Sequence, residues 1–195
     1  MRVLGVDPGL TRCGLGIVEQ VPGRRPALVA AGVIRTLPDL DTGRRLAAIE
    51  AGLLEWVEEY RPDAVTVERV FAQQNLHSVT GTAQAAGVAL LVAARLDLPV
   101  ALHTPTEVKA AITGSGQAGK AQVGGMVARL LSLATPPTPA DAADAVALAL
   151  CHLWRGGTVN RYAAAAAARG AGNRARSWSA VAARRAVPDL AGARP

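Results

Sequence analysis

The chain has only two cysteines and no long apolar run. Cys13 and Cys151 lie far apart, without a CxxC pair or a Cys/His cluster, which argues against a zinc site and a disulfide scaffold. The longest apolar stretch, residues 85–94, is well short of the roughly 20 residues that a membrane span needs. The first residues also show no signal-peptide layout. We therefore expect a cytoplasmic protein that does not insert into a membrane.

Lysine and aromatic residues are also scarce. Lys109 and Lys120 are the only lysines, and Phe71 is the only phenylalanine in a chain with 3% aromatic residues. The formal net charge of +6 is unevenly distributed. Residues 1–155 carry 14 basic and 14 acidic residues, whereas residues 156–195 carry seven arginines and one aspartate. The whole charge excess therefore lies in the C-terminal segment.

The length of 195 residues suits one domain of ordinary size. Residues 156–195 are rich in Ala, Arg and Gly and have no sustained hydrophobic period. We therefore expect a folded domain over residues 1–155 and a largely disordered basic tail over residues 156–195. The tail arginines fit two interpretations, a sequence-independent attraction to nucleic acid and an ordinary solvated tail.

The order of the periodic segments predicts an α/β fold. Short apolar runs separated by turn residues predict an antiparallel meander of three strands, and later strands alternate with segments of helical period. This order describes a mixed sheet covered by helices on both faces. The expected elements are strands 3–7, 13–21 and 26–36, helix 42–61, strand 64–70, helix 77–97, strand 100–105, and helices 106–113, 120–133 and from 139 onward.

Two aspartates stand in the otherwise apolar last helix. Asp141 has a structural explanation, because Thr138 suits an N-cap, Pro139 the first helical position and Asp141 the acidic position of a capping box. Asp144 has no such explanation. Residues three apart share a helical face, so both carboxylates point in roughly the same direction. An ionised carboxylate on an apolar face loses several kcal/mol of hydration unless something compensates it.

Two further acids end or interrupt apolar strands. Asp7 precedes a Pro-Gly turn, and Glu68 interrupts the strand at 64–70. Each alone fits an ordinary turn or the exposed face of an edge strand. If the first and fourth strands are neighbours and the last helix packs across them, both acids converge with the helical pair. Such a cluster repels itself unless divalent cations hold it together, and oxygen-only ligation selects Mg²⁺ or Mn²⁺. Two metals about 4 Å apart clamp the attacking and leaving oxygens of a phosphoryl displacement, which indicates phosphodiester hydrolysis.

Five segments carry a family pattern: GVDPGLTRCGLGIVE, VERVF, AQAAGVALLVAA, TPTEVKAAITGSGQAGKAQV and PADAADAVALALCH. In this order and spacing, over residues 1–154, they resemble the RuvC family of Holliday-junction resolvases. The resemblance implies a ribonuclease H-like fold with a mixed five-stranded sheet flanked by helices. It implies a homodimer that nicks two strands of four-way junction DNA symmetrically, in recombination and repair, with RuvA and RuvB as partners. It also implies that two Mg²⁺ ions per active site, replaceable by Mn²⁺, are bound by Asp7, Glu68, Asp141 and Asp144.

The resemblance assigns roles to three of the scarce residues. Lys109 and Lys120 match basic positions near the DNA backbone and the active site, where a positive charge neutralises phosphate and, for the catalytic Lys120, stabilises the transition state. Lys109 also suits an ordinary exposed helix face. Phe71 matches a loop that enters the junction, where its ring stacks on an unpaired base, although a lone phenylalanine also suits a core position. Residues 72–84 contain no lysine or arginine, unlike many relatives.

Two further motifs and two other function classes are compatible with parts of the sequence. GSGQAGKA (114–121) nearly satisfies the P-loop pattern, but it follows a predicted helix and has Ala121 where a hydroxyl belongs. DPGLT (7–11) has the shape of the phosphate loop of sugar kinases and actin-like ATPases, but those enzymes need two such domains and this chain has room for one. A related nuclease acting on RNA or single strands stays open. So does a catalytically silent nucleic-acid-binding module, in which the carboxylates would only repel the ligand.

Overall fold

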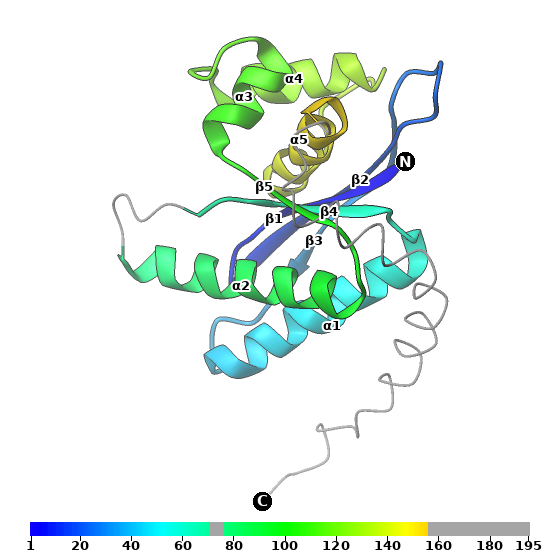
Figure 1. Cartoon of the computed structure of the whole chain (residues 1–195). Coiled ribbons are helices and arrows are strands. Elements are labelled where there is room, and N and C mark those ends of the chain that lie inside the picture. Colours follow the sequence, from blue (N-terminus) through cyan, green and yellow to red (C-terminus); the bar gives the residue numbers. More distant parts are fainter. Residues whose placement is uncertain (71–75, 156–195) are drawn as a thin grey trace, which may run out of the picture.

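A five-stranded sheet forms the centre of the computed structural model, which describes residues 1–70 and 76–155 (Figure 1). Its strands are β1 (Arg2–Asp7), β2 (Arg12–Glu19), β3 (Ala27–Arg35), β4 (Ala64–Glu68) and β5 (Val100–His103), in the spatial order β3-β2-β1-β4-β5. The β1–β2 and β2–β3 pairs are antiparallel, and the β1–β4 and β4–β5 pairs are parallel. The predicted mixed sheet is confirmed, and the first and fourth strands are neighbours.

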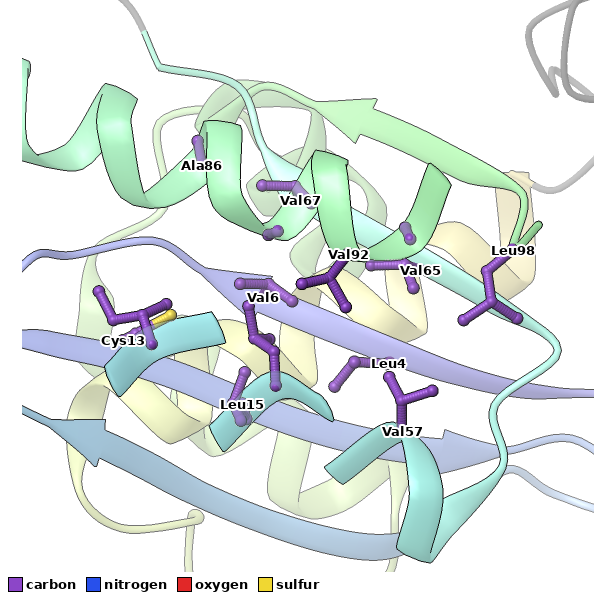
Figure 2. Packing of buried hydrophobic residues seen from close by; sticks show 14 of the residues in the cluster. Leu4, Val6, Cys13, Leu15, Val57, Val65, Val67, Ala86, Val92 and Leu98 are labelled. Atoms are coloured by element: carbon purple, nitrogen blue, oxygen red, sulfur yellow. The ribbon is translucent and has the colours of Figure 1, made fainter. Parts of the chain in front are cut away.

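Helices cover both faces of this sheet, as predicted. On one face lie α1 (Thr42–Tyr60) and α2 (Leu76–Arg95), and on the other lie α3 (Pro105–Thr113), α4 (Lys120–Leu130) and α5 (Ala140–Arg155) (Figure 1). Successive strand residues point to opposite faces and so enter different cores. Leu4 and Val6 of β1 pack with α1 and α2 (Figure 2), whereas Val3 packs with α5. Within the described residues, no helix combines the length and apolar character that crossing a membrane requires.

Glycines allow α5 to lie directly on the sheet. Gly5 of β1 and Gly14 of β2 both face this helix. A Cβ atom on Gly5 would lie 2.0 Å from the carbonyl oxygen of Ala145, and one on Gly14 would lie 2.0 Å from the carbonyl oxygen of Asp141. Any larger side chain would therefore push the helix away. This close backbone contact sets the position of the acidic residues of α5 above the strand ends.

The start of α5 differs from the expectation. The helix begins at Ala140, and the carbonyl of Pro139 accepts hydrogen bonds from the backbone amides of Ala142 and Ala143 at 3.0 and 3.2 Å. Pro139 is therefore the residue before the helix, so the prediction that Thr138 is the N-cap was wrong. The other predicted elements are all present, and their ends differ by a few residues, as is usual where helices and strands fray.

Candidate active site

Strand register brings the two strand acids side by side. Asp7 ends β1 and Glu68 ends β4, and Val6 pairs with Val67 in this parallel pair, so both acids stand at the same edge of the sheet. Strand alternation places both on the face that α5 covers, because Val6 and Val67 point into the opposite core. Glu68 lies on an interior strand, which removes the edge-strand explanation for it.

A cavity of about 260 Å³ opens beside these strand ends. Its charged lining comes from five different elements of the fold, and apolar or proline side chains complete its wall. Five predicted site residues that are distant in the sequence therefore meet here, whereas Asp141 is not among the lining residues, and the chemical roles of all of them stay predictions. The charged residues are Asp7, Glu68, Lys109, Lys120 and Asp144, and the other lining residues are Pro105, Val108, Val123 and Ala147.

Both acidic residues of α5 form an ion pair with a basic side chain. Nε and Nη2 of Arg12 each lie 2.6 Å from Oδ2 of Asp141. Lys120 Nζ donates to Oδ2 of Asp144 at 3.1 Å. The capping-box explanation of Asp141 is thus replaced by an ion pair with β2.

Burial and mutual repulsion dominate the electrostatics of the strand acids. Desolvation, followed by repulsion from Glu68, Asp144 and Asp141, raises the pKa of Asp7 to about 8. Burial and Asp144 likewise raise the pKa of Glu68, while Lys120 and Lys109 oppose that rise. The hydrogen bond to Asp144 raises the pKa of Lys120. Without a bound cation, Asp7 therefore holds a proton at neutral pH.

The donor chemistry of this site fits a divalent cation. Its carboxylates offer only oxygen ligands, which Mg²⁺ and Mn²⁺ favour. A cation would also offset the burial and the mutual repulsion that raise the pKa of Asp7 and Glu68. Across residues 1–70 and 76–155, however, no three His, Cys, Asp or Glu side chains are grouped closely enough to hold a metal ion. Two of the carboxylates form ion pairs with basic side chains instead, Asp141 with Arg12 and Asp144 with Lys120.

The raised pKa of Asp7 predicts that the metal-free protein loses stability as the pH rises. A carboxyl group with a pKa of about 8 when folded and 3.8 when unfolded binds its proton more tightly in the folded state. The resulting stabilisation is complete below the unfolded pKa and is lost as the pH rises toward the folded pKa. Asp7→Asn removes this ionisation, so at pH 8 in EDTA its Tm should exceed the parent's by at least about 3 °C, which corresponds to ~1 kcal/mol in a chain of this size. Calorimetry at pH 5 and pH 8 measures the difference, and an equal difference at both would contradict it.

Two pairings were not anticipated from the sequence. No role for Arg12 was predicted from the sequence. Arg12 and Gly14 are two residues apart on β2, so both face α5. His103 Nε2 lies 3.4 Å from Nδ1 of His152, yet the two are 49 positions apart and no local pattern connects them. Phe71 lies outside the described residues, so its stacking role stays a prediction.

The two cysteines are buried, and the glycine-rich segment follows a helix. Cys13 and Cys151 are both buried free thiols, which agrees with a packing role. The segment 114–119 connects α3 to α4 and therefore follows a helix. A P-loop requires a preceding strand, so this segment lacks the arrangement that nucleotide binding by a P-loop needs.

Comparisons with known proteins point to one family. A family model described as crossover junction endodeoxyribonuclease RuvC matches residues 3–152. A protein of that description from Cutibacterium acnes is 63% identical over 182 residues, which is 93% of each chain. Another from Streptomyces avermitilis is 64% identical over 161 residues, 83% of this chain and 92% of the relative. The structure of Thermus thermophilus RuvC in complex with a Holliday junction substrate has a TM-score of 0.76 and 36% identity, covering 82% of this chain and 98% of the other.

Proposed function

Because the chain belongs to the RuvC family of crossover junction endodeoxyribonucleases, we propose that its acidic cavity is the active site of a Holliday-junction resolvase. The resemblance read from the sequence is confirmed at the level of the family, the ribonuclease H-like fold and the metal-dependent nuclease activity. One observation carries the proposal for the site. Asp7, Glu68 and Asp144 line a single cavity together with the only two lysines of the chain.

In the proposed reaction, four carboxylates hold two Mg²⁺ ions per active site, with Mn²⁺ as a substitute: Asp7, Glu68, Asp141 and Asp144. When bound, such ions stabilise the attacking and leaving oxygens of phosphodiester hydrolysis. Asp7 must first release the proton that its raised pKa retains. Lys120 must leave Asp144, which its 81% exposed side chain permits. It is then the catalytic cation that neutralises the scissile phosphate, while Lys109 contacts the DNA backbone.

Symmetric nicking of two strands needs two active sites, so a homodimer is part of the proposal. β5 is an edge strand, and α2 packs on it. The exposed fractions of Leu102 on β5 and Leu91 on α2 are 39% and 46%, so this edge presents apolar surface. Such a surface supports a self-complementary contact around a two-fold axis. Sedimentation equilibrium of the full chain tests this, and the mass of a single chain at micromolar concentration would contradict it.

The remaining assignments concern the rest of the chain and its partners. The nuclease domain is proposed to span residues 1–155, and residues 156–195 form the basic tail, which lies outside the described residues. The substrate is four-way junction DNA, on which Phe71 stacks against an unpaired base. RuvA and RuvB are the proposed protein partners, and the proposed location is the cytoplasm.

A panel of labelled substrates tests the proposed activity. The full chain is incubated with a synthetic mobile four-way junction, linear duplex DNA, single-stranded DNA and an RNA–DNA hybrid, in Mg²⁺ or in EDTA. We expect paired symmetric nicks in the junction with Mg²⁺, little cleavage of the other substrates, and none in EDTA. Preferred cleavage of the hybrid or of single strands would indicate the related nuclease instead. Junction binding without cleavage in either Mg²⁺ or Mn²⁺ would indicate a silent binding module.

A further inference from the structure

Arg12 stands at the candidate active site but has no part in the mechanism above. Its Nε and Nη2 atoms both lie 2.6 Å from one oxygen, Oδ2 of Asp141. The exposed fractions of the two side chains are 41% and 31%, so the pair is only partly solvated. The Nε–H group donates a charge-assisted hydrogen bond to Oδ2, and the Nη2 contact completes the ion pair.

Hydrogen bonds from Thr36 and Arg45 hold the residues that precede Arg12 in the chain. The hydroxyl of Thr36 donates to the carbonyl of Leu10 at 2.6 Å, and the amide of Thr36 donates to the carbonyl of Thr11 at 3.2 Å. Arg45 donates to the hydroxyl oxygens of Thr11 and Thr36 at 2.6 and 2.9 Å. Arg12 itself is the first residue of β2 and pairs there with β3. The backbone from which the Arg12 side chain extends is therefore held in place on this side.

We infer that Arg12 is a positioning residue that competes with a divalent cation for the carboxylate of Asp141 and thereby weakens metal binding to the unloaded site. This inference rests on the proposed metal-dependent function. The lone pair of Oδ2 that accepts the hydrogen bond from Nε–H of Arg12 cannot ligate a cation at the same time. A fixed positive charge beside the site also repels the incoming ion. A cation must therefore displace Arg12 or bind without the full contribution of Asp141.

An orienting role for Arg12 predicts the opposite change in metal affinity. If Arg12 only oriented Asp141 for the metal, removing it would weaken metal binding, as loss of a supporting hydrogen bond does at other metal sites. If the pair were an inconsequential surface contact, removing it would change nothing. The direction of the change in metal affinity thus separates the three roles.

Isothermal titration of Mn²⁺ into the full chain, without DNA, tests the inference. We expect Arg12→Gln to tighten Mn²⁺ binding about fivefold, the factor expected for a modest ion pair. Arg12→Lys retains the positive charge but lacks the guanidinium group. It should bind Mn²⁺ no more tightly than Arg12→Gln. In an Asp141→Asn background, Arg12→Gln should have a smaller effect, because its competitor is gone. Arg24→Gln, with the same charge change beyond the opposite end of β2, should leave the affinity unchanged.

Two results would overturn the inference in different ways. Unchanged or weaker Mn²⁺ binding by Arg12→Gln, with a melting curve like that of the parent, would overturn the competing role and leave the proposed function standing. No Mn²⁺ binding by the parent chain would overturn the metal site itself and the inference with it.

Discussion

The Asp7→Asn variant is expected to bind four-way junction DNA as tightly as the parent and to cut it at least about 1000-fold more slowly, a loss of ~4 kcal/mol of transition-state stabilisation. Burial, followed by repulsion from three neighbouring carboxylates, raises the pKa of Asp7 to about 8. The amide has nearly the same volume but offers no anionic oxygen to a cation. The substitution adds no negative charge to the site, so attraction to the DNA phosphates is not weakened and DNA binding is retained.

Single-turnover cleavage of a labelled junction and fluorescence anisotropy in EDTA measure these two effects separately. Asp39→Asn is the matched control, because Asp39 is exposed in the segment before α1 and undergoes the same chemical change. It should cut at the parental rate. A rate for Asp7→Asn within tenfold of the control would show that the chemistry does not depend on this carboxylate.

The sheet and the convergence of the strand acids could be predicted from local patterns. Short apolar runs located β1 and β4, and Asp7 and Glu68 stood out because each ends or interrupts such a run. Side chains alternate between the two faces of a strand, and the preceding residues Val6 and Val67 point into the opposite core. Asp7 and Glu68 therefore lie on the α5 face. Once the two strands are paired in parallel, the acids must be neighbours.

The pairing of Arg12 with Asp141 could not be read in this way. It depends on the distance between β2 and α5, which is set by a backbone contact at Gly14 between residues far apart in the sequence. Local reasoning instead offered a capping box for Asp141, which was plausible in isolation and was overridden by the ion pair. The contact between His103 and His152 was missed for the same reason, because it joins the end of β5 to α5.

The close approach of α5 to the sheet predicts that Gly5→Ala is strongly destabilising. The added Cβ would lie 2.0 Å from the carbonyl oxygen of Ala145 and 3.0 Å from the backbone nitrogen of Ala149, so the helix backbone itself must move. Overpacking of this kind costs about 3 kcal/mol, which in a chain of this size lowers Tm by about 6–12 °C. Thermal unfolding followed by circular dichroism measures the change.

The same substitution links the fold to the active site. α5 carries Asp141 and Asp144, so moving the helix away from β1 separates both from Asp7 and should slow junction cleavage even at temperatures where the variant is folded. Gly125→Ala is the matched control, because a Cβ at this position in α4 meets no atom within 4 Å. It should leave cleavage unchanged and keep or raise Tm, since alanine favours a helix over glycine by about 1 kcal/mol. Gly5→Ala could instead match Gly125→Ala in both its Tm and its cleavage rate. That result would show that α5 does not lie close enough to β1 to bring the helix carboxylates near Asp7.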